Sequence, residues 1–139
     1  MAIADGQVLT AADFLPYAQL AAAPTSFVPT WDGVTVGNGF TAGRWARIGP
    51  LVCVEMELIF GSTTTVTDYP LQPLTGLPQS LYAVGGGWAY DSSAGAFHPV
   101  AWRQGDWIAA NGERVSSTWP WTWTSGDQLR LSMTYLTTP

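Results

Sequence analysis

Residues 51–60 read Leu-Val-Cys-Val-Glu-Met-Glu-Leu-Ile-Phe, and this stretch decides the fold. From Val52 to Phe60 every second residue is apolar, while Cys53, Glu55 and Glu57 occupy the positions between them. Successive side chains of a β-strand point to opposite faces, so this alternation predicts a strand with one face in the core and the other in solvent.

The flanking sequence extends this pattern in both directions. Gly49-Pro50 predicts a turn back to a paired strand at 40–48. Further strands are predicted at 81–90, 96–103, 107–110, 113–118 and 128–136, with Asn111-Gly112 as a hairpin turn between two of them. Seven to nine short strands with this spacing indicate an all-β fold. We therefore expect residues 26–139 to form an antiparallel β-sandwich or jelly-roll-like domain.

The first 25 residues follow a different pattern and predict a short, partly helical N-terminal arm. Thr10-Ala11-Ala12-Asp13 reads as a variant of the helix capping box, while Pro16 predicts a kink or two short helical pieces. The arm carries more large apolar side chains than a solvated tail needs, and we expect them to anchor it on neighbouring proteins. These candidate anchor contacts are Val8, Leu9, Phe14, Leu15, Tyr17 and Leu20.

Charge is scarce in this chain of 139 residues. Only 11% of the residues are charged, against roughly 25% in typical soluble domains. There is no lysine, and the formal net charge is −5. A chain with so few cations is poorly suited to neutralising phosphates, so a nucleic-acid partner is not expected. The weak self-repulsion suits a protein that packs into an assembly or meets neutral carbohydrate.

Targeting signals are not expected either. No run of about 18 apolar residues predicts a membrane helix. The N-terminus lacks a basic region and places Asp5 and Asp13 where a signal peptide would be apolar. We therefore expect synthesis in the cytoplasm without a signal peptide, and no membrane insertion.

The residues that could carry catalysis or bind a metal form no recognisable motif. His98 is the only histidine and Cys53 the only cysteine, so neither a zinc site nor a disulfide framework is expected. Asp91 and Asp106 lie in predicted turns, but without a calcium-loop pattern. Glu55 and Glu57 share one strand face, and a glycan hydrolase using this pair is one hypothesis. A solvated face is the favoured interpretation, so we expect no enzyme activity, no metal and no cofactor.

Aromatic residues suggest a second kind of site. The chain contains eight tryptophans, three of them in Trp119-Pro120-Trp121-Thr122-Trp123. If this stretch is extended, its three indoles face the same way. They then either stack on sugar rings, with Trp119, Trp123 and Asp127 as candidate glycan or receptor contacts, or pack in the core or a subunit interface.

An ordered series of short motifs gives the chain a family resemblance. It resembles the compact β module of minor tail, fibre and related virion proteins of tailed phages that infect high-GC Gram-positive bacteria. The motifs that carry the resemblance are Phe27-Val28-Pro29-Thr30-Trp31, Gly37-Asn38-Gly39, Arg44-Trp45-Ala46-Arg47-Ile48-Gly49, Phe60-Gly61-Ser62-Thr63-Thr64, Leu77-Pro78, Val115-Ser116-Ser117-Thr118 and Gly126-Asp127. Upstream, Gly6-Gln7-Val8-Leu9-Thr10-Ala11-Ala12-Asp13 looks like the N-terminal segment that often precedes such modules.

The resemblance implies a non-enzymatic virion structural protein on the exterior of a bacteriophage tail or head. It implies a homotrimer, with other virion proteins as partners of the N-terminal arm and with host attachment as a role. Because a long fibre shaft is missing, a capsid decoration or head-fibre protein that docks on the major capsid protein is an alternative. A glycan-binding module that recognises host-surface carbohydrate is a further one.

Overall fold

The computed structural model describes residues 23–67, 72–74, 77–78, 80, 83–104 and 106–137. This part of the chain contains strands and no helix. The strands are β1 (Thr25–Phe27), β2 (Thr30–Asp32), β3 (Val34–Thr35), β4 (Phe40–Ile48), β5 (Leu51–Ile59), β6 (Thr65–Val66), β7 (Gln72–Leu74), β8 (Val84–Asp91), β9 (Ala96–Arg103), β10 (Ile108–Ala110), β11 (Glu113–Arg114) and β12 (Gln128–Leu136).

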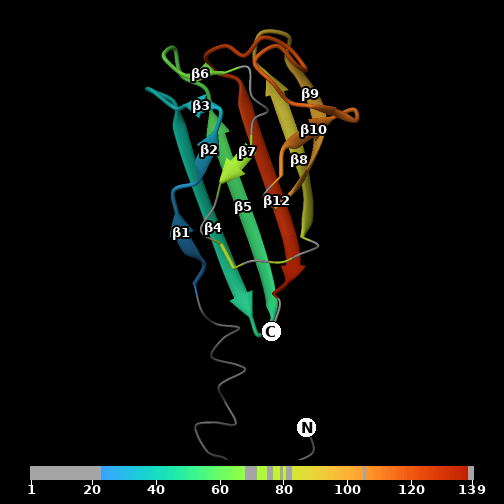
Figure 1. Cartoon of the computed structure of the whole chain (residues 1–139). Helices are drawn as coiled ribbons and strands as arrows, with labels where there is room; N and C mark the ends of the chain where they lie inside the picture. Colours follow the sequence, from blue (N-terminus) through green and yellow to red (C-terminus); the bar gives the residue numbers. More distant parts are fainter. Residues whose placement is uncertain are drawn as a thin grey trace, which may run out of the picture.

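Eight of these strands form one sheet in the order β1-β4-β5-β12-β8-β9-β10-β11. Every pairing in it is antiparallel. The two-stranded sheets β2-β7 and β3-β6 complete the described fold, and β2 and β7 lie in front of β4 and β5 (Figure 1). The prediction of an all-β, antiparallel fold is therefore confirmed.

The core lies on the face of the large sheet that β2 covers. The inward side chains of β5 are Val52, Val54, Met56 and Leu58, and those of β12 are Leu129, Leu131, Met133 and Tyr135; all are buried. Trp31 of β2 packs onto this cluster and donates an indole hydrogen bond to Thr41 Oγ1 at 2.8 Å. The apolar half of residues 51–60 thus fills the core, as the alternation of this stretch predicts.

The glycine run of β8 lets two backbones approach each other closely. A Cβ on Gly87 would collide with the carbonyl oxygen of Arg130, and one on Gly85 with that of Ser132. Both carbonyls belong to β12, the neighbour of β8 in the sheet. Gly86 points to the other face, where the nearest atom to an added Cβ is 3.4 Å away. The run therefore serves the close packing of β8 against β12.

Several predicted strands match the structure closely. The strands predicted at 40–48, 96–103 and 128–136 are found with those bounds, and the strand that ends at Phe60 stops one residue earlier. The prediction of a strand over 113–118 is wrong after Arg114. Val115 turns into the core with no exposed surface, and Ser116 N–H donates to the carbonyl of Trp119 at 3.0 Å, which closes a turn.

The N-terminal arm, with its predicted helical pieces and anchor residues, lies outside the described residues except for its last positions. The first strand of the described fold, β1, begins at Thr25, which pairs with Trp45 of β4. No helix in the part of the chain that the structure describes is long and apolar enough to span a membrane.

Candidate functional site

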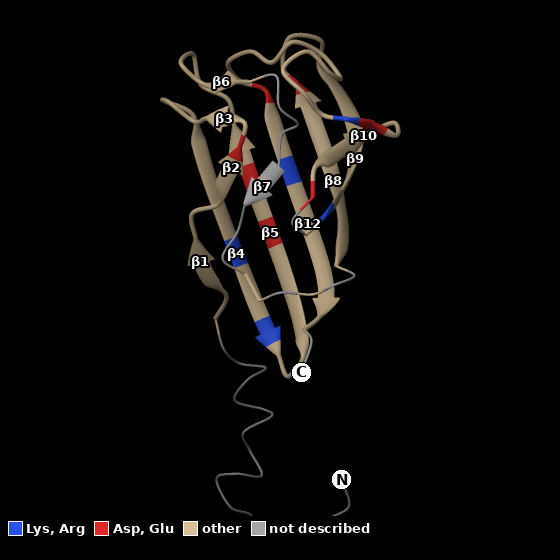
Figure 2. Ribbon diagram, in the orientation of Figure 1, with Lys and Arg blue, Asp and Glu red and all other residues tan. Residues whose placement is uncertain are grey.

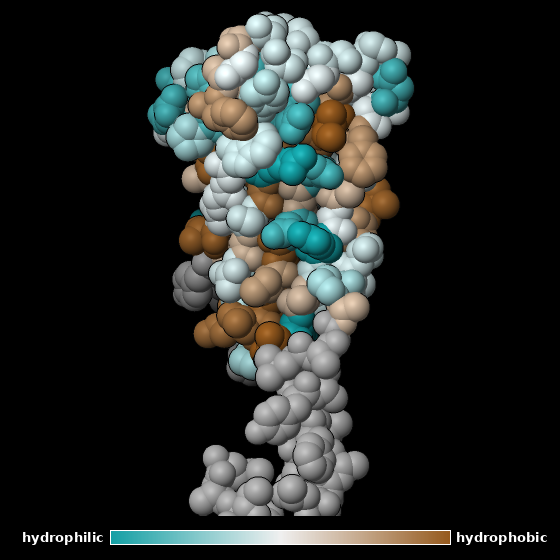
Figure 3. Space-filling model, turned by 180° about the vertical axis from the view of Figure 1, so that it is seen from behind, coloured by the Kyte–Doolittle hydropathy of each residue, from teal (hydrophilic) through white to brown (hydrophobic). Residues whose placement is uncertain are grey.

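The large sheet has a second face, which we call the outer face. Its side chains come from the alternate positions of each strand, and most are exposed or half-buried. On β5 they include Cys53, Glu55 and Glu57, the polar half of the alternation. Figure 3 shows this face: hydrophilic residues cross its middle, and hydrophobic residues lie toward its two ends. The outer face is an extended surface on which this fold can meet a partner.

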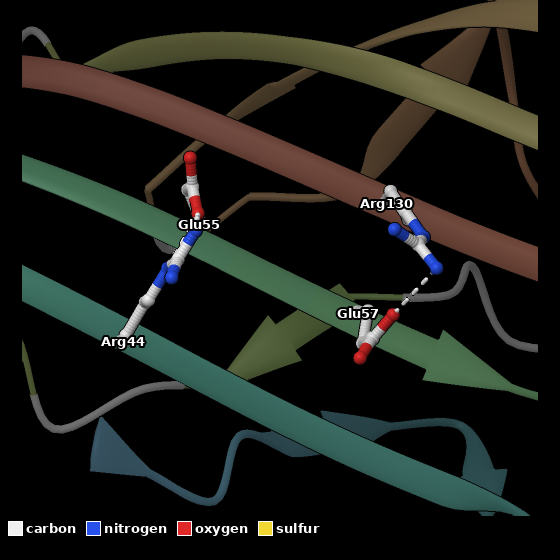
Figure 4. Close-up of polar contacts among 4 residues, drawn as sticks. All are labelled: Arg44, Glu55, Glu57 and Arg130. Carbon is white, nitrogen blue, oxygen red and sulfur yellow. Dashed lines mark hydrogen bonds and ion pairs between the residues drawn. The ribbon is translucent and has the colours of Figure 1, made fainter.

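Strand register builds a charged group in the middle of the outer face. Glu55 of β5 lies opposite Arg44 of β4, and Glu57 lies opposite Arg130 of β12. The first pair is held by Arg44 Nη2 and Nε at 2.6 and 2.7 Å from Glu55 Oε2, and the second by Arg130 Nη2 at 3.1 Å from Glu57 Oε2 (Figure 4). Cross-strand ion pairs of this kind fix the direction of long side chains. Figure 2 shows these charges on β4, β5 and β12.

Next to the charged group lies an aromatic cluster on β8 and β9. Trp88 faces Arg130 across the strand pair, and the guanidinium carbon lies 5.3 Å from the centre of the indole. Phe97 meets Trp88 in a T-shaped arrangement with 5.2 Å between ring centres, and Tyr90 meets Phe97 at 4.7 Å. Trp88 is thereby held between a cation and another ring, which limits its rotation.

A groove of about 670 Å³ crosses the middle of the outer face. The four residues of the charged group line it together with Trp88 at one end, while small residues such as Ala42 and Ser132 leave it hollow. Its size falls within the usual range of small-molecule sites, roughly 300–1,000 Å³. The groove is the best-formed candidate site among the described residues.

One end of the outer face is apolar. Ile48 of β4 and Leu136 of β12 both pair with Leu51 of β5, so three aliphatic side chains lie side by side, and Val84 begins the next strand. Ile48, Val84 and Leu136 expose 43%, 64% and 62% of their surface. We call these four residues the apolar end. So much exposed aliphatic surface in one place is typical of a contact surface.

The predicted glycan or receptor contacts do not form a platform. Residues 119–123 contain no strand, so the condition under which the three indoles would face the same way is not met. Trp123 stacks on Phe60 at 4.6 Å and donates to the carbonyl of Ser116 at 2.8 Å. Trp119 donates to the carbonyl of Ala110 at 3.3 Å. Both indoles are half-buried and bind the chain's own backbone, because the segment has no neighbouring strand to hold it extended.

Asp127 is fully buried, so the expectation that it lies beside a ligand is not met. Its Oδ1 accepts hydrogen bonds from the backbone and hydroxyl of Ser92 at 2.9 and 2.8 Å. Its Oδ2 accepts from Thr124 N–H at 2.7 Å and from Trp121 Nε1 at 3.0 Å. The carboxylate thus joins the β8–β9 turn to the segment before β12, a structural role that the sequence reasoning missed.

The remaining polar candidates are scattered. His98 is half-buried with its ring 4.9 Å from that of Trp121. Asp91 caps its own turn, and Asp106 pairs with Arg103 at 2.5 Å. Within the described ranges no three potential metal-ligating side chains of the His, Cys, Asp and Glu types come together.

Sequence reasoning placed Glu55 and Glu57 on one solvent-facing surface but missed the rest of the groove. Arg44, Arg130 and Trp88 occupy outward positions of strands that the sequence predicts, so a correct strand order would have brought them together. That order places β12 between β5 and β8, and nothing local in the sequence encodes it.

Comparison with protein-family models, with curated proteins and with solved structures found no match to this chain. The functional argument therefore rests on the residues and their geometry.

Proposed function

We propose that the protein is a non-enzymatic structural component of a tailed-phage virion, of the minor tail or fibre type. Its β-sandwich is exposed on the particle surface as an oligomer and takes part in host attachment. The observation that carries the proposal is the outer face of the eight-stranded sheet, whose apolar end is unusually exposed for a protein that works alone.

The apolar end favours self-association. Exposed aliphatic side chains on adjacent strands gain stability when a second copy covers them, at roughly 25 cal/mol for each Å² removed from water. The low charge of the chain also favours self-association. Only 11% of the residues are charged, so charge repulsion and the cost of removing charges from water oppose close packing only weakly. A trimer is the state implied by the resemblance to phage modules.

Two further features support a structural role. The ordered motifs that resemble phage virion modules include strand and turn residues that build this fold, such as Trp31 in the core and Gly37 at a positive φ of 58°. The two glutamates that a hydrolase would use each form an ion pair with an arginine, which is consistent with a structural role. A capsid decoration protein docked on the major capsid protein is the second candidate, because the same outer face suits attachment to a head.

Light scattering of the full chain at micromolar concentration tests the oligomer. We expect a mass of about three times the 14.9 kDa of one chain. A mass equal to that of one chain would contradict self-association and the proposed role of the apolar end as a subunit contact.

A further inference from the structure

We propose that the groove on the outer face binds neutral carbohydrate, with Trp88 as the stacking surface and the Arg44–Glu55 and Arg130–Glu57 pairs as hydrogen-bonding groups. This inference rests on the proposed role as an exposed module and names the ligand class of its attachment site. It also moves the carbohydrate site away from Trp119, Trp123 and Asp127, whose polar atoms are occupied within the fold.

The charge of the groove selects the ligand. Two arginines and two glutamates line it, so the formal charge of the group is zero, and each charge already has a partner across the strands. An anionic ligand would have to displace a glutamate, and a cationic ligand would have to displace an arginine. A neutral ligand with many hydroxyls needs neither exchange.

The hydrogen-bonding capacity of the group matches sugar hydroxyls. All contacts that the described residues make with the two carboxylates fall on Oε2, so Oε1 of each glutamate is left to accept from a ligand. The Arg44 and Glu55 side chains are 64% and 60% exposed, so their other polar atoms face solvent. Planar groups with two adjacent donors or acceptors suit neighbouring hydroxyls on a pyranose ring.

Trp88 supplies the apolar contact. Its indole lines the groove and is restrained by Arg130 and by the edge of Phe97, so little rotamer freedom is lost when a sugar ring packs against it. The apolar C–H face of a pyranose stacks on an aromatic ring, while its hydroxyls remain at the edge. In this groove the hydroxyl-bearing edge of the sugar ring would face the ion pairs of β4, β5 and β12.

The experiment uses the purified full chain and a panel of oligosaccharides containing glucose, galactose, mannose or rhamnose, with uronate and sialylated saccharides for comparison. Binding is measured by isothermal titration calorimetry and by NMR chemical-shift changes. We expect at least one neutral saccharide to bind, with shifts at Trp88 and Ser132. Absence of neutral binding at millimolar concentration, or a preference for the acidic saccharides, would overturn the proposal.

Variants locate the site. Trp88→Ala should weaken binding at least about tenfold, and Glu57→Gln should weaken it less. Trp107→Ala is the matched control, because Trp107 is 38% exposed and stacks under Arg114, away from the groove. Ser132→Phe fills the groove without removing any of its contact groups, and should abolish binding in a folded protein. Retained affinity in folded Ser132→Phe would overturn the proposal even if Trp88→Ala fails to fold.

A second copy of the chain is the competing occupant. If hydrogen exchange shows the groove strands protected by oligomer formation and added saccharide does not compete, the groove is a subunit interface and the carbohydrate proposal fails. These measurements need only the purified chain. If no carbohydrate binding is found, the proposed virion role is tested separately, by locating the protein in particles.

Discussion

At the residue scale, Asp127 shows how a single buried carboxylate organises the end of the fold where β5, β8 and β12 approach their turns. Burying an ionised group is costly unless it is fully hydrogen-bonded, and four donors within 3.0 Å meet that need here. The backbone continues the connection, since Phe60 N–H donates to the carbonyl of Asp127 at 2.9 Å. A carboxylate in such a place holds loops together.

Asp127→Ala should therefore lower the free energy of unfolding by about 2–4 kcal/mol, because it leaves several buried donors without an acceptor. Chemical denaturation measures the loss. Asp32→Ala is the matched control, since Asp32 is exposed at the end of β2, and should change stability by less than about 0.5 kcal/mol. Equal stability of the two variants would show that the Asp127 bonds contribute little.

Asp91 offers a pH-dependent test of a surface turn. The hydroxyl of Ser93 donates to Asp91 Oδ1 at 2.7 Å and, with the N–H of Ala94, lowers the pKa of this carboxyl below its ordinary value. Because the pKa is lowered in the folded state, the charged carboxylate stabilises the folded state at pH values above the ordinary pKa. This contribution to stability is lost as the pH falls through the folded-state pKa.

NMR titration of the Asp91 carboxyl should therefore show a midpoint below that of an unstructured aspartate, and Ser93→Ala should raise it toward the ordinary value. Ser125→Ala, a serine outside this turn, should leave the midpoint in place. A Ser93→Ala midpoint equal to wild type would contradict the assigned cause.

At the element scale, β8 depends on glycine at alternate positions for a steric reason. Gly87→Ala places a methyl group against the backbone carbonyl of Arg130, which cannot move without disturbing the β8–β12 ladder. We expect a loss of about 1–3 kcal/mol. Gly86→Ala, one position away and pointing outward, should be tolerated. Thermal unfolding of the two variants tests this directly. Equal melting temperatures would contradict the close approach of the β8 and β12 backbones.

The same scale shows why sequence reasoning succeeded for some elements and failed for others. Residues 51–59 and 128–136 alternate strictly because each strand has one face in the core and one in solvent, so the local pattern reveals them. Residues 119–123 gave a misleading pattern. Their indoles bind carbonyl groups of residues 110 and 116 and the Asp127 carboxylate, contacts that depend on the tertiary fold.

The outer groove shows the same limit. Its glutamates were visible as the polar half of one strand. Arg44 lies on β4, the hairpin partner of β5, but Arg130 lies on a strand that neighbours β5 in space and is distant along the chain. Arg130 is separated from Glu57 by most of the domain, and only the insertion of β12 beside β5 brings them together. Chemistry-bearing residues could be identified from sequence, whereas their grouping into a site required the strand order.

At the scale of the whole molecule, our proposals give the two regions of the outer face separate roles: the apolar end would join copies of the chain, and the groove would bind the ligand. The double variant Ile48→Asp with Leu136→Asp should reduce the mass in solution to that of a single chain, because it places charges where aliphatic contacts are needed. Val28→Asp is the control, since Val28 is 73% exposed but lies outside the apolar end. An unchanged mass in the double variant would place the subunit contact elsewhere.

The central claim is that this chain is an exposed component of a phage particle, and its location in purified virions tests that claim most directly. Antibody against the full chain, carrying a gold label, should bind the exterior of intact particles, at the tail for a fibre-type protein and over the head for a decoration protein. Mass spectrometry of the same particles should detect the chain. If the chain is abundant in lysates but absent from purified particles, the account of its function is wrong.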